Sequence, residues 1–352
     1  MNIRMKTMLG SSMSWAVVMR NLAIEMEKDN SLFLESINGY DMVSENLLSR
    51  VMPCFNSDLD ITYTMPQNFE KRFHSKSKIK AAIYNYESSL LPIAWRNSHV
   101  FVDRIFPSSN YCKDVFVNSG FPIDKVFVIP HGINHSEFSG DKKTEDIKDG
   151  VFNFLNVSIP HYRKNLDKLI EAYYLEFSDS EGVCLNIKTS ISSPKKYFEI
   201  NVLDVLQNIG SKFKKKLPPV KILTKRYDSM YELYNSSDCL VSTTSSEGFG
   251  LPILEAMASK LLVVCPNQTG QSDFLNDENS IDICGKYIES PKEYQYWRPS
   301  IGSEVFMPDV DSIRSSMRAA YSGSFNDKKN NAYETSLKYT WNYAYKKIME
   351  SL

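Results

Sequence analysis

The sequence predicts an α/β protein made of two successive domains, each built on a parallel sheet. The chain has 352 residues, more than one ordinary hydrophobic core requires. Short runs rich in β-branched and aromatic residues alternate with stretches of helical periodicity, which is typical of parallel strands covered by helices on both faces. A polar, charged and glycine-bounded stretch at residues 139–150 interrupts this alternation, so we expect a linker there.

The first half of the chain contains a clear amphipathic helix and a series of candidate strands. Residues 14–28 predict the helix, because their apolar side chains recur at helical spacing: Trp15, Val18, Met19, Leu22 and Met26. The candidate strands, with helical segments between several of them, are residues 31–37, 58–65, 79–86, 99–106 and 125–130.

The second half repeats the alternation of strands and helices. Strands are predicted at residues 152–158, 183–189, 220–224, 239–243 and 261–265. Helices are predicted at residues 165–177, 196–210, 228–236 and 252–259, and residues 334–352 predict one long amphipathic helix. Open α/β sheets bind ligands beyond the carboxyl ends of their strands, so we expect a binding cleft at that edge.

The composition is that of a globular protein without a strong charge preference. Hydrophobic residues make up 42% and charged residues 24% of the chain, and the net charge is −1. This balance gives no overall attraction toward nucleic acid or an anionic membrane. No window approaches the ~18 apolar residues of a membrane span, and the early apolar run is too short for a signal peptide. We expect a cytoplasmic protein, with peripheral attachment to the inner membrane face left open.

The cysteines give no sign of a metal site or a disulfide framework. The chain has six of them, none in a C-x-x-C pair and none near a histidine pair at zinc spacing. We therefore expect a reducing compartment and no bound metal.

The stretch "SSEGFGLPILEAMA" at residues 245–258 carries the strongest chemical signal. Its glycine loop precedes a predicted helix that begins near Pro252, so backbone N–H groups and the helix start can hold a phosphate. Glu255 lies about one turn into that helix, where a carboxylate can accept hydrogen bonds from a ribose diol, and Glu247 can face a sugar on the same phosphates. The spacing alone is equally compatible with a glycine turn whose acids tune a helix start.

Several segments resemble glycosyltransferase family 4, which has the GT-B fold. "EGFGLPILEAMA" resembles the E-x7-E motif of that family. Further matches follow in the family's order: "KVFVIPHGIN" (125–134), "RKNLDKLIEAY" (163–173), "YDSMYELYNSSDCLVS" (227–242) and "YTWNYAYKKI" (339–348). The resemblance covers roughly residues 80–352. It implies two Rossmann-like domains facing each other across a cleft: residues 1–145 on the acceptor side, 151–330 for the donor, and a terminal helix, 331–352, crossing back to the first.

The resemblance also implies a set of catalytic residues. Lys164 would neutralise the leaving diphosphate, and Arg163 is a candidate beside it because the family's usual arginine, just before this segment, is absent. Glu247 would hold the donor sugar. The segment 86–116 is similar to that of a sub-group with a glutamate near the cleft, so Glu87 would contact donor or acceptor sugar, unless it only caps a helix.

A second set of residues is implied for donor binding. Glu255 would hold the ribose of the nucleotide. The backbone around Phe249, Gly250 and Leu251 would contact phosphate and sugar. Gly10 and Ser11, in the first loop of the chain, would face the diphosphate. His131, at the hinge between the domains, would line the cleft or be structural.

Two further segments contain charged motifs that could bind a ligand. The segment "EKRFHSKSKIK" (70–80) is either a solvated loop or a site for an anionic acceptor, held by Lys71, Arg72, Lys76 and Lys78. The "DLD" at residues 58–60 looks like a metal-binding D-x-D, but no nucleotide-binding half precedes it, so we expect no metal there.

The resemblance implies a retaining, metal-independent glycosyltransferase without a cofactor. It would move a hexosyl or pentosyl group from a nucleotide-diphosphate sugar to a hydroxyl acceptor. The acceptor expected first is a glycan or a lipid-linked glycan. The alternatives are an anionic acceptor such as a hydroxymethylated base in DNA, a phosphorylase or epimerase of the same fold, and a non-catalytic binding protein. The oligomeric state is left open.

Overall fold

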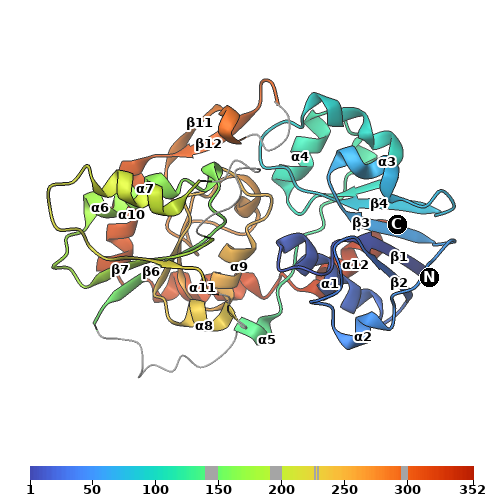
Figure 1. Cartoon of the computed structure of the whole chain (residues 1–352), viewed down its shortest axis with the longest axis horizontal. Helices are drawn as coiled ribbons and strands as arrows, with labels where there is room; N and C mark the ends of the chain where they lie inside the picture. The colour runs from blue at the N-terminus through green and yellow to red at the C-terminus, as the bar shows by residue number, and fades with distance from the viewer. Residues whose placement is uncertain (139–149, 191–199, 226, 228–229, 295–299) are drawn as a thin grey trace. The chain divides into compact units, whose positions relative to one another are not determined.

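The structure, a computed structural model, describes residues 1–138, 150–190, 200–225, 227, 230–294 and 300–352 (Figure 1). The chain divides into two compact units. The first joins Met1–Ile133 to Tyr339–Leu352, and the second is Asn134–Lys338. Almost all of the expected linker lies outside the described residues. Each unit is an α/β sandwich around a parallel sheet, so the predicted fold class is confirmed.

The sheet of the first unit has five parallel strands in the order β2-β1-β3-β4-β5. Their bounds are Ser31–Ser36, Asn2–Thr7, Leu59–Tyr63, Ile79–Ile83 and Arg104–Phe106. The strand β1 pairs with both β2 and β3. It was not among the strands predicted from the sequence. Ile3 and Met5 on β1 are fully buried, as expected for a strand covered by helices.

Helices from both ends of the chain cover the first sheet. They are α1 (Ser14–Met26), α2 (Glu45–Leu48), α3 (Phe69–Arg72), α4 (Asn110–Asn118) and α12 (Trp341–Glu350). The last helix packs on α1, and Asn30 Nδ2 donates to the hydroxyl of Tyr345 at 2.9 Å. Ile133 and Thr340 form a β-bridge where the chain leaves and re-enters the unit.

The sheet of the second unit also has five parallel strands, in the order β10-β9-β6-β7-β8. Their bounds are Leu262–Val264, Cys239–Val241, Phe152–Val157, Val183–Lys188 and Val220–Leu223. A separate antiparallel hairpin consists of β11 (Gly285–Glu289) and β12 (Glu304–Pro308), drawn in orange in Figure 1.

The helices of the second unit pack on the sheet and on one another. They are α5 (His135–Phe138), α6 (Leu166–Glu176), α7 (Val202–Gly210), α8 (Met230–Asn235), α9 (Leu251–Ala258), α10 (Val310–Ser322) and α11 (Asn326–Ser336). The helix α11 packs on α9, and α5 packs on α8. The core under α6 and α10 includes Phe154, Tyr173 and Phe177. The predicted helices at 196–210 and 228–236 begin outside or partly outside the described residues.

Two predicted strands of the first unit are wrong in part. Residues 99–106 were expected as one strand, but the 3-10 helix Ile93–Phe101 occupies the start and only Arg104–Phe106 pairs. That helix buries Trp95 and leaves Val100 exposed, so the apolar run does not mark a strand. Residues 125–130 run beside β5 with one bridge, Ile105 to Val126, and are no regular strand. Pro130, which lacks an N–H, ends this run.

The final predicted helix is two helices. The structure ends α11 at Ser336 and begins α12 at Trp341. The side chain of Thr340 accepts a hydrogen bond from the N–H of Tyr343, which gives α12 its own N-terminal cap. The amphipathic pattern continued across the break because both helices bury one face.

A close backbone approach at Gly132 gives a stability prediction. A Cβ at Gly132 would lie 2.3 Å from both the carbonyl carbon of Thr340 and the nitrogen of Trp341. Gly132→Ala should therefore lower the free energy of unfolding of the first unit by about 1–3 kcal/mol or more, as overpacking does. Urea unfolding of parent and variant measures this. The control is Gly210→Ala, whose Cβ would lie 3.5 Å from Leu217. Equal stability of both variants would contradict the close approach.

Candidate active site

A buried carboxylate and two cations meet in the second unit, in the loops that follow β6 and β9. Lys164 Nζ contacts Glu247 Oε1, and Arg163 Nη1 lies 3.3 Å from Glu247 Oε2. Arg163 Nη1 also donates to the carbonyl of Ser246 at 2.7 Å. The three charged side chains are only 9–12% exposed. The structure thus brings together three of the four predicted catalytic residues.

Electrostatics keep this cluster ionised. Burial raises the pKa of Glu247, but the charges of Lys164 and Arg163 and hydrogen bonds from Lys164 and Thr244 outweigh it and hold that pKa at about 2. The carboxylate is therefore charged at neutral pH. With two cations and one anion, the cluster has a net charge of +1, which favours an anionic ligand beside it.

The turn that presents Lys164 has a neutral histidine at its start. His161 Nδ1 accepts the backbone N–H of Arg163 at 3.1 Å and caps the 3-10 turn Tyr162–Lys164. Burial lowers the pKa of His161 to about 3, with further lowering by the charges of Arg163 and Lys164. The imidazole therefore adds no charge at neutral pH.

The residue after Lys164 ties this turn to the loop after β9. Asn165 has φ 48°, a left-handed conformation that asparagine tolerates better than most residues. Its Nδ2 donates to the carbonyl of Thr243 and to Ser245 Oγ, both at 2.8 Å. In return, Thr243 Oγ1 donates to the carbonyl of Lys164 at 2.9 Å. The two loops are therefore held in one fixed arrangement.

The glycine loop is shaped by backbone geometry. Gly250 is the N-cap of α9 with φ 98°, so a side chain there would be strained. The N–H of Glu247 donates to Thr269 Oγ1 at 3.1 Å. Phe249 is 3% exposed and packs on Phe274, with ring centroids 5.3 Å apart. Its side chain serves the core, and Leu251 is half-buried at the helix start.

Glu255 has a partner that the sequence did not reveal. Its Oε2 accepts a hydrogen bond of 2.6 Å from the hydroxyl of Tyr234 on α8. Burial raises the pKa of Glu255 and the charge of Glu137 adds to the rise, against the effect of the Tyr234 hydrogen bond. Burial also raises the pKa of Tyr234, so its hydroxyl stays protonated and donates. One carboxylate oxygen is therefore fixed in position.

The remaining predicted residues belong to the first unit. His131 is buried, its Nε2 lies 3.4 Å from Asn85 Nδ2, and burial lowers its pKa to about 3. Glu87 is half-buried just beyond the end of β4. The ligand contacts expected of His131 and Glu87 stay predictions.

The first loop of the chain uses its polar groups within the unit. The N–H of Gly10 donates to Asn38 Oδ1 at 3.1 Å, and the carbonyl of Ser11 accepts from Arg20 at 2.7 Å. A Cβ at Gly10 would lie 2.4 Å from the carbonyl oxygen of Gly39. Close packing of two backbone segments thus explains this glycine without a ligand.

The basic segment lies on α3 and the loop after it. Lys71, Lys76 and Lys78 are exposed and Arg72 is half-buried. Lys78 Nζ forms an ion pair of 2.8 Å with Asp58, which occupies one of the four predicted acceptor contacts.

The aspartates of "DLD" have structural partners. Asp60 Oδ2 accepts from Arg4 at 2.7 Å, from the N–H of His74 at 2.8 Å and from Ser77 at 3.1 Å. It thereby fixes the loop that carries the basic segment. Among the described residues, no three His, Cys, Asp or Glu side chains are grouped so that they could hold a metal ion.

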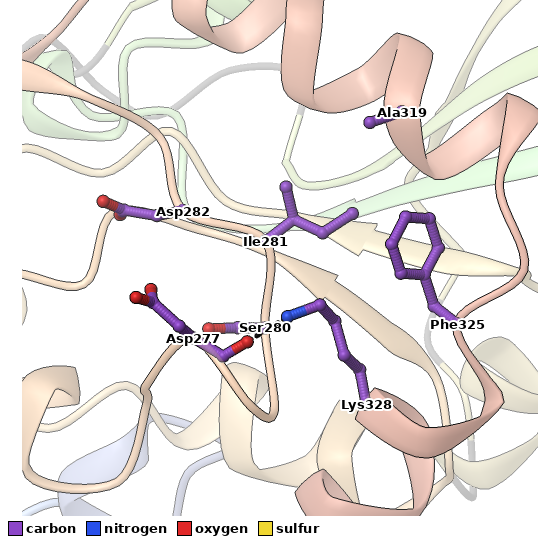
Figure 2. A pocket seen from close by; sticks show the side chains of 7 residues that line it. All are labelled: Asp277, Ser280, Ile281, Asp282, Ala319, Phe325 and Lys328. Atoms are coloured by element: carbon purple, nitrogen blue, oxygen red, sulfur yellow. Dashed lines mark hydrogen bonds between the residues drawn. The ribbon is translucent and has the colours of Figure 1, made fainter.

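A separate hollow in the second unit involves none of the predicted residues. Figure 2 shows Ile281, Phe325 and Ala319 on its apolar side and Lys328 reaching toward Asp277. Ser280 and Asp282 complete the lining, and the volume is about 280 Å³. Lys328 Nζ donates to the carbonyl of Asp277, so this lysine is used within the rim.

Comparison with known protein families gives a match to a segment that contains Glu247 but not Lys164 or Arg163. Residues 214–295 match the family model described as glycosyl transferases group 1. This segment includes Glu247, Glu255 and Tyr234. The matched segment lies within the second unit.

Two curated relatives match over part of the chain. A probable sucrose-phosphate synthase of Thermosipho melanesiensis is 27% identical over 160 residues, which is 44% of this chain and 35% of the relative. The O-antigen chain mannosyltransferase B of Escherichia coli is 36% identical over 72 residues, 19% of each chain. The matches thus span little more than a third of these relatives at most.

Solved structures match over nearly the whole chain. A glycosyltransferase from Rickettsia africae has a TM-score of 0.70 at 15% identity, covering 99% of this chain and 97% of its own. Anabaena Alr3699/HepE in complex with UDP and glucose has a TM-score of 0.68 at 13% identity, covering 99% and 98%. At these identities the likeness shows the fold, which is GT-B, as the sequence predicted.

The sequence predicts no membrane-spanning segment, and the helices of the structure bear on this point. None of the helices in the described parts of the chain combines the length and apolar character needed to cross a bilayer.

The ion pairs of Glu247 predict an acid-sensitive stability. The folded pKa of Glu247 lies below its ordinary value of 4.5, so its contribution is complete above 4.5 and is lost as pH falls toward 2. Glu247→Gln should lower the free energy of unfolding by about 3–5 kcal/mol at neutral pH, because two buried cations lose their partner. This deficit should shrink as pH falls through that window, which urea unfolding at several pH values measures.

The matched control is Glu255→Gln, where the sign is reversed. The folded pKa of Glu255 is raised by burial, so ionisation of this group opposes folding at neutral pH. The variant should be at least as stable as the parent at pH 7 and lose that advantage in acid. A pH-independent deficit for Glu247→Gln would contradict the ion-pair account.

Proposed function

We propose that this chain is a retaining glycosyltransferase that moves a sugar from a nucleotide-diphosphate donor to a hydroxyl acceptor without a bound metal. The observation that carries the proposal is the buried cluster of Lys164, Arg163 and Glu247. It lies in the loops beyond β6 and β9, where α/β sheets bind ligands, and Glu247 lies in the segment that matches glycosyl transferases group 1.

The charge of the cluster suits the leaving group. When the bond between the anomeric carbon and the phosphate oxygen breaks, its electron pair stays on the diphosphate, which gains negative charge. Lys164 and Arg163 are already fixed and desolvated, so they stabilise this charge without reorganising. Two protein cations can thereby supply the compensation that a divalent metal supplies in other transferases.

The acid residues suit the two ends of the donor. In this proposal Glu255, which lies on α9 and is oriented by Tyr234, accepts hydrogen bonds from the ribose hydroxyls. Glu247 accepts hydrogen bonds from hydroxyls of the transferred sugar while it keeps Lys164 in position. The acceptor oxygen bonds to the anomeric carbon on the face that the diphosphate leaves, and the acceptor proton passes to the departing phosphate oxygen. This outcome retains the anomeric configuration.

The proposed acceptor is a hydroxyl group on a glycan or a lipid-linked glycan. For an anionic acceptor, Lys71 and Lys76 are the candidates with exposed side chains, and Arg72 is half-buried beside them. Lys78 contributes less, because Asp58 already compensates its charge. The relatives support transfer to a carbohydrate, since the names of both describe enzymes of saccharide synthesis.

A donor screen tests the proposed function. Purified protein is incubated in EDTA with a panel of UDP-, GDP-, ADP- and dTDP-sugars, and release of the nucleoside diphosphate is measured with and without simple glycoside acceptors. At least one donor should be turned over. Lys164→Ala should lower kcat about 100-fold or more, the typical effect of losing one electrostatic contact to a developing anion.

Lys168→Ala, on the helix α6 that follows the turn of Lys164, is the control and should behave like the parent. Thermal stabilisation by a donor without release of nucleoside diphosphate would favour the non-catalytic binding protein. Activity that vanishes in EDTA and returns with manganese would contradict the metal-independent mechanism.

Nucleotide binding tests the role of Glu255. Glu255→Ala should weaken binding of the nucleoside diphosphate product by about 1–3 kcal/mol, because hydrogen bonds to a charged acceptor are lost. Titration calorimetry measures the affinity. Glu232→Ala on α8, an exposed acid near Tyr234 in sequence, should leave the affinity unchanged. Unchanged affinity of Glu255→Ala would remove this residue from the ribose contact.

A further inference from the structure

The β11–β12 hairpin is an addition to the second unit that its main sheet does not require. Within the described residues the two strands pair with each other and with no further strand, from Gly285 opposite Pro308 to Glu289 opposite Glu304. Most of β11 is exposed, including Tyr287 at 47%. The other strand, β12, buries Val305 and Phe306, so it anchors the hairpin on the unit, and its further contacts indicate what the hairpin does.

Two of those contacts reach the loops of the candidate active site. The N–H of Phe306 on β12 donates to the carbonyl of Ser245 at 3.2 Å. The 3-10 turn Lys292–Tyr294, which follows β11, contacts the turn that carries Lys164. There the hydroxyl of Tyr294 donates to Asn165 Oδ1 at 2.7 Å. The hairpin thus touches both loops that hold the charged cluster.

The hydrogen bond from Tyr294 completes the side chain of Asn165. Both N–H donors of this amide are used, one on the carbonyl of Thr243 and one on Ser245 Oγ. The Tyr294 hydroxyl serves the remaining oxygen, and Asn165 is only 2% exposed. A buried amide oxygen that loses such a donor is destabilised, since water cannot easily replace it.

The conformation of Asn165 sets the direction of its neighbour. Asn165 has a left-handed backbone, ends the turn Tyr162–Lys164 and begins α6. Its side-chain hydrogen bonds hold this uncommon conformation in place. Any relaxation of Asn165 therefore rotates the peptide that joins it to Lys164 and moves the ammonium group relative to Glu247.

We infer that Tyr294 is a positioning residue, which fixes Asn165 and through it the ammonium group of Lys164 in the arrangement that stabilises the leaving diphosphate. The inference rests on the proposed function for its catalytic part. It assigns a role to the hairpin, which braces the site from outside the sheet.

The test compares Tyr294→Phe with the parent, because phenylalanine keeps the ring and removes only the hydroxyl. With the donor found in the screen, kcat should fall about 10-fold or more, since small displacements of a catalytic group cost that much. The KM for the donor should change less than about threefold, because most donor contacts persist. A purely structural role would lower the melting temperature and leave kcat per folded molecule unchanged.

Two further variants sharpen the comparison. Tyr287→Phe removes a second tyrosine hydroxyl, on β11, which donates to Gln268 Oε1 at 3.0 Å, and should behave like the parent. Asn165→Gly keeps a residue suited to φ 48° and removes the amide. In that background Tyr294→Phe should have no further effect on kcat, since the two side chains act as one unit. Additive losses, or equal losses in Tyr287→Phe, would overturn the inference.

Hydrogen exchange tests the brace without any donor. In the parent, the N–H groups of Lys164, Asn165 and Leu169 are bonded to the carbonyls of His161, Tyr162 and Asn165. Tyr294→Phe should speed exchange in this segment and leave the segment of α10 unchanged. Unchanged exchange in the segment 161–169 would overturn the brace. If the parent turns over no sugar nucleotide while exchange responds as expected, the proposed function fails and the brace stands.

Discussion

The arrangement of the second unit's functional loops depends on one buried ion-pair cluster. Glu247 comes from the loop after β9, and Lys164 and Arg163 come from the turn after β6. Because β6 and β9 are neighbouring parallel strands, their carboxyl ends lie at one edge and the two loops meet there. If either loop moved away, the charged side chains of the other loop would be left buried without a partner. The sheet topology therefore brings the loops together, and the charges determine how they fit.

The groups around the cluster keep its charge at a fixed value. His161 is neutral at physiological pH because burial and the adjacent cations lower its pKa. Neutral amide and hydroxyl groups on Asn165, Thr243 and Ser245 make the remaining connections between the loops. The site therefore presents a small positive charge on a rigid support. Such preorganisation is what stabilisation of a developing anion requires.

Much of this could be predicted from the sequence, and the reasons differ between residues. The glycine loop before α9 was recognisable because its glycines can expose backbone N–H groups to an anion and Pro252 suits a helix start, and the structure adds the positive φ of Gly250. The two-sheet fold followed from strand and helix periodicity. The periodicity did not reveal the break before Thr340, because helices on either side bury the same kind of face. Apolar content likewise suggested a strand where Val100 is in fact exposed.

The partners of the site residues could not be predicted in this way. Tyr234 lies 21 positions before Glu255, and Tyr294 lies 129 positions after Asn165, so no local pattern links either pair. An asparagine between a lysine and a helix was the available sign of a left-handed turn at Asn165. The charge neutralisation of Lys78 by Asp58 also depends on strand placement, because 20 residues separate them.

The chain path through the first unit has a consequence for how the protein is made. That unit needs both Met1–Ile133 and Tyr339–Leu352, whereas the second unit is one continuous segment, Asn134–Lys338. During synthesis on the ribosome, the segment that forms α12 emerges after the whole of the second unit, so the face of α1 that it covers stays uncovered until then. The second unit has all of its residues earlier and can complete its core first. The first unit is then closed by a segment that is made only after the second unit.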